Sequence, residues 1–137
     1  IGNGDINGAE KAKILLEYSN VDALMIGRAA IGRPWIFREI KHYLATGELL
    51  PAPTVREVVE VLRKQIQMNL EWRDNERTGI LMMRRHFAKY FPGLYNFRAL
   101  KIQLLRAESN VEVNEILDKI VDIYGNQKLD YTKTGLK

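Results

Sequence analysis

The pattern of apolar and polar positions divides the chain into two parts, and the change lies near residue 54. In the first part, two short apolar runs each end in a glycine turn, one at the very start and one at residues 21–26, which is predicted as a buried strand. Between them, residues 10–18 have apolar side chains at helical spacing and lysines on the other side. This order of strand, turn and helix predicts two consecutive units of a parallel α/β fold.

A further helix is predicted from Pro34 to about Gly47, because proline is favoured at the first helical position and glycine after the last. Beyond it, Pro51 and Pro53 break helical structure, so we place a domain boundary after residue 53. The predicted organisation is an α/β domain at 1–53, a helical domain at 54–125 and a flexible tail at 126–137.

The second part of the chain has the pattern of four amphipathic helices. Thr54 and Glu57 have the spacing of a capping box, and a long helix is predicted from there to about Arg77. Three more helices are predicted at residues 79–91, 95–107 and 111–124. Short connections between amphipathic helices favour an antiparallel bundle. The expected core positions are Val55, Val58, Val59, Leu62, Ile66, Leu70, Ile80, Met83, Phe87, Tyr90, Phe97, Leu100, Leu104, Val113, Ile116, Leu117, Ile120 and Tyr124.

Both glycine turns have features of an anion site. Gly27 lets a ligand approach the backbone, and Arg28 supplies a planar fork of donors beside the unpaired N–H groups of the helix expected next. Asn3, Gly4 and Asp5 form the other turn, where we expect the Asp5 side chain to cap the following helix. The carboxyl ends of parallel strands meet at one edge of a sheet, where phosphate commonly binds. Plain strand-to-helix turns with a surface arginine are the alternative interpretation.

Several segments resemble tRNA-dihydrouridine synthases. Residues 3–6 (NGDI), 22–30 (DALMIGRAA) and 34–40 (PWIFREI) are similar to the closing part of that family's barrel. Residues 84–90 (RRHFAKY) resemble an Arg-Lys-His motif in its C-terminal helical domain. The resemblance implies an α/β remnant, the last two βα units of a TIM barrel, followed by a mainly α-helical bundle domain.

The resemblance also implies an activity and a cofactor. Enzymes of this family use FMN to reduce the 5,6 double bond of specific uridines in tRNA, and NADPH reloads the flavin. Carried over by position, the residues that hold the flavin phosphate are Asn3, Gly4, Asp5, Gly27 and Arg28. The family's catalytic cysteine has no counterpart, because this chain contains no cysteine. We therefore expect a C-terminal fragment that is inactive alone, with its catalytic cysteine upstream.

The distribution of charge indicates a second candidate site. The net charge is +4, and residues 1–53 contain equal numbers of acidic and basic side chains, so the excess lies in 54–137. Residues 78–107 contain no aspartate or glutamate, whereas a solvated helix face normally mixes both signs. We predict that cations of this stretch contact tRNA phosphates, and that most of its aromatic residues are core. The predicted RNA-binding residues are Arg84, Arg85, Lys89, Arg98 and Lys101. Arg84 borders the apolar stripe of its helix, so a structural role is also expected for it. The sequence leaves open whether His86 faces RNA or a neighbouring helix.

The remaining composition excludes some classes of protein. No apolar run is long enough to cross a bilayer, and no secretory leader is recognised at the start, so we expect a cytoplasmic protein. With no cysteine and two histidines, a metal centre is not expected. Two alternatives stay open. One is a non-catalytic helical interaction domain that binds an acidic protein partner, and the other is the end of a different phosphate-binding α/β barrel enzyme.

Overall fold

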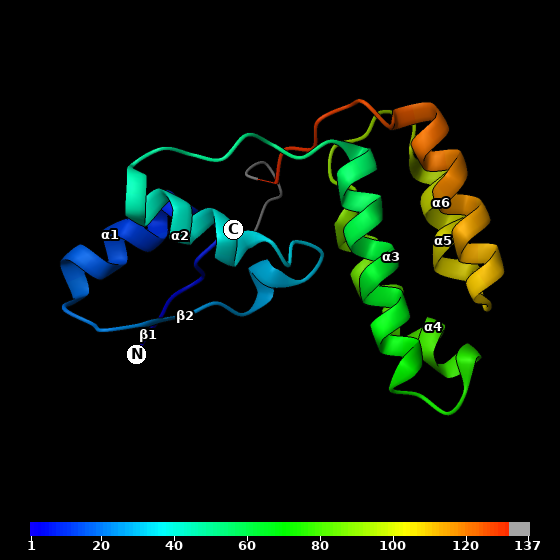
Figure 1. The fold of residues 1–137 in the computed structure, drawn as a ribbon, viewed down its shortest axis with the longest axis horizontal. Helices are drawn as coiled ribbons and strands as arrows, with labels where there is room; N and C mark the ends of the chain where they lie inside the picture. The colour runs from blue at the N-terminus through cyan, green and yellow to red at the C-terminus, as the bar shows by residue number, and fades with distance from the viewer. Residues whose placement is uncertain (132–137) are drawn as a thin grey trace. The chain divides into compact units, whose positions relative to one another are not determined.

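Two short strands, six α-helices and a 3₁₀ helix make up residues 1–131, the part of the chain that the computed structural model describes (Figure 1). These residues form two units. The first contains residues 1–51 together with Tyr131, and the second contains Ala52–Asp130. The chain is therefore mostly helical, and its strands are confined to the first unit.

The first unit is built on a parallel pair of strands, β1 (Gly2–Asn3) and β2 (Leu24–Met25). The helices α1 (Ala9–Ser19) and α2 (Ile36–Thr46) lie side by side over these strands (Figure 1). A small core fills the space between them, formed by Ile6, Ala9, Ala12, Ile36 and Ile40.

The second strand is shorter and more exposed than the apolar run predicts. A buried strand was expected at residues 21–26, but pairing is limited to two residues, and Met25 is 53% exposed. The physical reason is that β2 pairs only with β1 among the described residues, so its far edge and one face have no strand or helix against them.

The chain after Gly27 also differs from the prediction. A three-residue 3₁₀ helix, η1 (Arg28–Ala30), replaces the α-helix expected there, and α2 begins at Ile36 rather than at Pro34. Gly32 has a left-handed backbone with a φ of 76°, which ends the short helix. The turn over Pro34 and Trp35 is closed by a three-residue bond from the Ile36 amide to the Arg33 carbonyl at 3.1 Å, and α-helical bonding begins with the Glu39 amide and the Trp35 carbonyl.

The second unit consists of α3 (Val55–Glu71), α4 (Glu76–Tyr90), α5 (Arg98–Arg106) and α6 (Asn110–Tyr124). Helix α3 packs against α4 and α6, and α5 packs against the same two helices, so the four enclose one core (Figure 1). Every expected core position is buried except Leu70, Leu100 and Tyr124, which are half-buried.

The ends of the helices follow their capping residues. The capping box is confirmed, because the Glu57 amide donates to Thr54 Oγ1 and the Thr54 amide donates to Glu57 Oε2 at 2.8 Å. Helix α3 was expected to reach Arg77 but ends at Glu71, after which Trp72 is 88% exposed and contributes nothing to the core. Asn75 then caps α4 by accepting from the Thr78 amide at 3.0 Å, which is why α4 begins earlier than predicted.

Residues 127–131 are held in place, which corrects part of the expected flexible tail. The Leu129 amide donates to the Pro53 carbonyl at 2.9 Å, and Leu129 is buried. Tyr131 packs edge-on against Trp35, with 5.3 Å between ring centroids. Leu129 and Tyr131 thus hold this segment by apolar contacts, which were not predicted because the tail as a whole is polar. The rest of the predicted tail, residues 132–137, lies outside the described residues.

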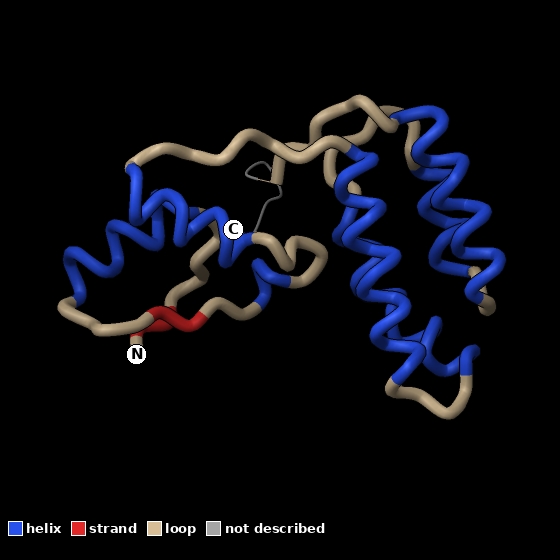
Figure 2. Tube along the Cα trace, viewed as in Figure 1, coloured by secondary structure: helices blue, strands red, loops and turns tan. Residues whose placement is uncertain are grey.

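The connection between α2 and α3 is irregular, as Figure 2 shows. It runs from Gly47, which ends α2 in the left-handed conformation with a φ of 74°, to the cap at Thr54. The division between the two units lies in this segment, after Pro51.

Candidate functional site

The turns that follow the two strands come together at one edge of the first unit. The guanidinium of Arg28 donates to the carboxylate of Asp5, although these residues are separated by 23 positions in the sequence. The parallel register, which pairs Gly2 with Leu24, places both strand ends at the same edge. Both side chains are mostly exposed, at 69% for Arg28 and 61% for Asp5.

A cavity of about 210 Å³ lies at this edge. A Cβ added to Gly27 would meet nothing within 4 Å, so there is open space beside the backbone there. Gly4 does not line the cavity; a Cβ added to it would lie 3.9 Å from the Leu15 side chain. The lining residues are Asn3, Asp5, Ile6, Met25, Gly27, Arg28 and Ala29.

The role expected for the Asp5 side chain is wrong. The residue that caps α1 is Gly8, which provides no side-chain cap, and the Asp5 carboxylate is turned to Arg28 instead. Asp5 has a left-handed backbone with a φ of 43°, which aspartate tolerates better than most residues and which takes its side chain away from α1.

Lys11 is a cation of this edge that the sequence analysis missed. Its ammonium donates to the backbone carbonyl of Asp5 at 2.9 Å. From the sequence alone, Lys11 cannot be distinguished from any outward-facing lysine of an amphipathic helix. Its position in the first turn of α1, directly after the glycine turn, was the available signal. With Lys11 and Arg28 against Asp5, this edge carries one more positive than negative charge.

Four of the five predicted RNA-binding cations lie exposed on the second unit. Arg85 and Lys89 are one turn apart on α4, and Arg98 and Lys101 are neighbours on α5, which packs against α4. None of the four forms an ion pair or hydrogen bond within residues 1–131. No ion pair within residues 1–131 therefore neutralises their positive charge.

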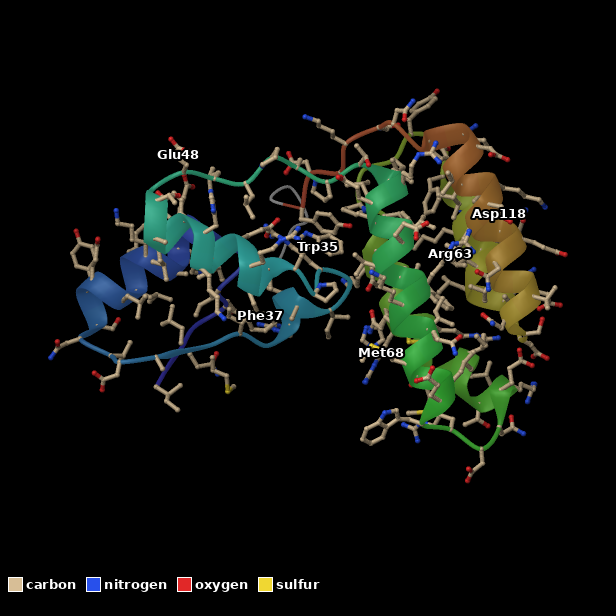
Figure 3. The ribbon with its side chains drawn as sticks, in the orientation of Figure 1. Trp35, Phe37, Glu48, Arg63, Met68 and Asp118 are labelled. Carbon is tan, nitrogen blue, oxygen red and sulfur yellow. The ribbon has the colours of Figure 1, made fainter. Side chains whose placement is uncertain are left out.

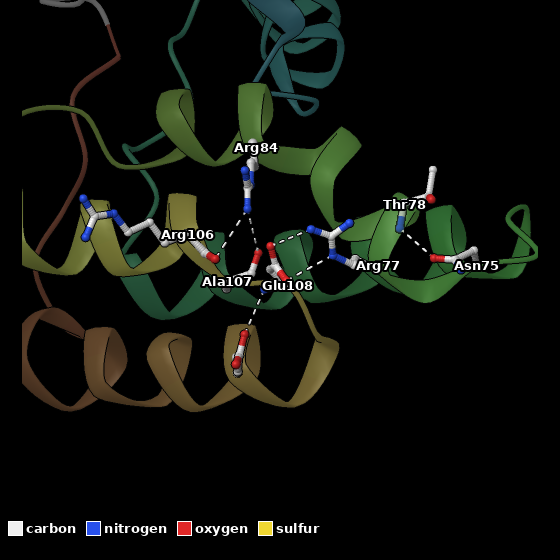
Figure 4. A network of polar contacts seen from close by, with 8 residues as sticks. Asn75, Arg77, Thr78, Arg84, Arg106, Ala107 and Glu108 are labelled. Carbon is white, nitrogen blue, oxygen red and sulfur yellow. Dashed lines mark hydrogen bonds and ion pairs between the residues drawn. The ribbon is translucent and has the colours of Figure 1, made fainter.

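The fifth predicted cation, Arg84, is turned into the bundle. Its Nη2 lies 3.4 Å from the Arg106 carbonyl and 3.5 Å from the Ala107 carbonyl, and its Nε is buried (Figure 4). A cation suits this place, because the C-terminal end of α5 carries unpaired carbonyls and the negative end of the helix dipole. Arg84 thus closes a helix end, unlike the four exposed cations.

Glu108, the first acidic residue after the acid-free stretch 78–107, lies close to Arg84 and forms an ion pair with Arg77. Glu108 accepts two hydrogen bonds from Arg77, at 2.9 and 3.0 Å (Figure 4). These bonds and the charge of Arg77, with a smaller contribution from Arg84, lower the pKa of Glu108. The same contact raises the pKa of Arg77. Glu108 is thus compensated by Arg77 and has no ion pair with the exposed cations.

His86 is half-buried between α4 and α3. Its Nδ1 lies 3.3 Å from Nε2 of Gln65, whose Oε1 accepts a hydrogen bond from the Tyr90 hydroxyl. Burial lowers the pKa of His86, and the charge of Arg85 lowers it further. Gln65 could not be predicted as a functional residue, because a single glutamine beside a regular apolar stripe carries no signal of its own.

A second cavity, of about 290 Å³, lies between α3 and α6. Arg63 reaches across from α3 to Asp118 at 2.6 Å, and also donates to the Asn114 side chain (Figure 3). Arg63 is thereby occupied within the bundle, and its contacts tie α3 to α6.

Residues 1–131 contain neither a helix that could cross a membrane nor a cluster of potential metal ligands. None of their helices is both long and apolar enough to cross a membrane. No cluster of three or more histidine or acidic side chains in this range is arranged to hold a metal ion.

Comparison with known proteins gives a consistent match. The family model for dihydrouridine synthase (Dus) matches residues 1–125. The tRNA-dihydrouridine synthase B of Pseudomonas aeruginosa is 48% identical over 101 residues, which covers 71% of this chain and 30% of that protein. The proteins of the same name from Salmonella typhimurium and Yersinia pestis are 49% identical over 92 residues and 60% identical over 67. The chain thus spans less than a third of the length of these curated relatives.

Proposed function

The chain belongs to the dihydrouridine synthase family, and we propose that it forms the flavin-phosphate end and the tRNA-binding helical domain of an FMN-dependent tRNA-dihydrouridine synthase. The complete enzyme reduces specific uridines in tRNA, with NADPH as the reductant. The observation that carries the proposal is the meeting of the Asp5 and Arg28 turns beside an open cavity, in a chain whose match to the family spans both turns.

The first unit is proposed to be the last two βα units of a TIM barrel, over residues 1–53. Its exposed apolar side chains support this assignment. Met25 on β2 and Ile1 before β1 are both exposed, although short parallel strands are normally covered on both faces. In a barrel, further strands and helices would cover them. The helical domain is proposed to span residues 54–125.

The residues at the paired turns fit a phosphate group. Arg28 offers a largely exposed guanidinium, Gly27 leaves room beside the backbone, and Lys11 adds a second cation close by. Asn3 lines the same cavity and carries an amide donor, while Gly4 lies outside the lining and contributes through the backbone of the turn. Asp5 is the one unfavourable group, because its carboxylate competes with phosphate for Arg28.

FMN, when bound, supplies the hydride for reduction of the uracil 5,6 double bond. The task of this chain's residues is to anchor the phosphate end of the cofactor and so fix its position in the barrel. The proton donor is proposed to lie in another part of the protein, because the family's cysteine has no equivalent among the residues of this chain. The chain alone is therefore expected to be inactive.

The second unit is proposed to bind tRNA through Arg85, Lys89, Arg98 and Lys101. Their exposure and their lack of ion pairs within residues 1–131 support a role in contacting phosphates. Arg84 is excluded from this set, since its side chain already closes the end of α5. An acidic protein surface would fit the same cations. Unchanged tRNA affinity after charge reversal at Arg85 and Lys89 would favour such a protein partner.

The cofactor assignment is tested by replacing Arg28 with alanine in the complete protein. Losing charge-assisted hydrogen bonds should weaken FMN binding by about 1.5–3 kcal/mol, which is about 10- to 150-fold. Arg33→Ala is not a suitable control, because Arg33 pairs with Glu39 and holds the fold. Arg38→Ala removes an exposed arginine elsewhere in the same unit and should leave FMN affinity unchanged. Equal FMN affinity in the Arg28→Ala and wild-type proteins would refute the assignment.

A further inference from the structure

Three side chains form a hydrogen-bonded chain from the core of the bundle to its surface. The Tyr90 hydroxyl donates to Oε1 of Gln65, and Nε2 of Gln65 lies 3.3 Å from Nδ1 of His86. Tyr90 is fully buried, and burial raises the pKa of its hydroxyl, so the hydroxyl stays protonated and able to donate. In the structure the Gln65 amide has its oxygen toward Tyr90 and its NH₂ toward His86.

This orientation decides which nitrogen of His86 carries the proton. An amide NH₂ donates and cannot accept, so Nδ1 of His86 must be the acceptor. In the neutral ring the proton is then on Nε2. Nε2 has no hydrogen-bond partner among the described residues, and it is not enclosed by protein. The ring therefore offers one free N–H donor at the surface of α4.

The donor lies among the cations of α4. Arg85 is adjacent in the sequence, and Lys89 follows three residues later, which places it beside His86 on the helix surface. The surroundings of His86 nevertheless keep the ring uncharged near pH 7, because burial and the neighbouring Arg85 both oppose protonation. His86 thus differs from Arg85 and Lys89, because it is a neutral hydrogen-bond donor beside two basic side chains.

We propose that Gln65 is a positioning residue that fixes His86 in the Nε2–H form, so that His86 donates a hydrogen bond to an oxygen of bound RNA without adding charge. The inference rests on the proposed tRNA-binding function of the second unit. A neutral donor is suited to phosphate oxygens, 2′-hydroxyls and base carbonyls, and it contributes direction where Arg85 and Lys89 contribute charge.

The positioning role is tested in the free chain by nitrogen NMR. Long-range ¹H–¹⁵N spectra at pH 8 distinguish a protonated from an unprotonated ring nitrogen, and His42 serves as the internal reference. The wild-type chain should show His86 with a protonated Nε2 and an accepting Nδ1. In Gln65→Glu, a carboxylate that only accepts replaces the NH₂, so the proton should move to Nδ1.

The matched control is Gln67→Glu, which adds the same charge two residues along α3, where the side chain bonds Glu71 instead of His86. It should leave the His86 spectrum unchanged. A wild-type ring protonated on Nδ1 would overturn the proposal without the need for any variant. So would a folded Gln65→Glu chain whose His86 nitrogen shifts match those of the wild type.

The RNA role is tested by titrating tRNA into His86→Ala and Arg85→Ala chains over a salt series at pH 8. His86→Ala should weaken binding roughly 2- to 10-fold at every salt concentration without changing the slope of log affinity against log salt. Arg85→Ala should flatten that slope by about 0.7–0.9. Unchanged affinity in His86→Ala, while Arg85→Ala weakens binding, would overturn this inference and leave the proposed function standing. If neither variant weakened binding, the proposed function itself would fail.

Discussion

The carboxylate of Asp5 accepts a hydrogen bond from the guanidinium of Arg28, which joins the two strand-end turns of the first unit. The pair holds the turns together, but it also occupies the cation that we propose for the flavin phosphate. Both side chains are mostly exposed, and such ion pairs contribute about 0.2–1 kcal/mol. A phosphate can therefore displace Asp5 from Arg28 at small cost.

Replacing Asp5 with asparagine should strengthen FMN binding in the complete protein. The change removes a negative charge beside the phosphate, and asparagine keeps the left-handed backbone that Asp5 adopts. We expect affinity to rise about 2- to 5-fold, within the energy of an exposed pair. The measurement is quenching of flavin fluorescence at constant ionic strength. Weaker binding in Asp5→Asn would mean that the carboxylate supports the cofactor.

Replacing Arg84 with alanine should destabilise the bundle. The guanidinium approaches two carbonyls at the end of α5, and its Nε is buried, so we expect the free energy of unfolding to fall by about 1–2 kcal/mol. Arg85→Ala is the matched control, because its exposed side chain has no partner in the described residues and should change stability by less than about 0.5 kcal/mol.

Urea denaturation of the full chain measures both variants. An unchanged unfolding midpoint in Arg84→Ala, together with weaker tRNA binding, would restore the role that the sequence suggests for Arg84.

Limited proteolysis should degrade the first unit before the second. Residues 52–130 have a core enclosed by four helices, a capping box and the contact of Leu129 with Pro53. The first unit has a two-stranded sheet and a core cluster of five buried residues, so it has less to hold it together. Mass spectrometry at early times should find a protected fragment that contains α3–α6. Cleavage within α3–α6 while residues 1–51 remain intact would contradict this order of stability.

The helical pattern was the most predictable part of the fold. The apolar stripes of α3, α4 and α6 repeat over several turns, so their buried residues follow directly from spacing. Local interactions were harder to foresee. The sequence does not show that Asn75 starts α4 early, that Gly32 interrupts the chain before α2, or that Leu129 returns to Pro53.

The candidate sites were also predictable only in part. The spacing of the two glycine turns predicted where cations and backbone meet, but not that Arg28 would already be paired with Asp5. Charge counting identified the cations of α4 and α5, and helical spacing placed Arg84 at the border of the apolar stripe, but neither showed that Arg84 rather than Arg85 closes the end of α5. That distinction depends on which side of α4 faces the end of α5, and only packing decides it.

The most direct test of the proposed function is the salt dependence of tRNA binding by a chain with Arg85→Glu and Lys89→Glu. Each lost phosphate contact should flatten the slope of log affinity against log salt by about 0.7–0.9, so the double variant should bind more weakly and with a slope about 1.5 lower in magnitude. Arg38→Glu with Lys41→Glu is the matched control, because it reverses two exposed cations of α2 at similar spacing. We expect a reduced slope in the Arg85→Glu, Lys89→Glu chain and a nearly wild-type slope in the control. Unchanged affinity and slope in a folded Arg85→Glu, Lys89→Glu chain would contradict the proposed tRNA-binding role and favour an acidic protein partner.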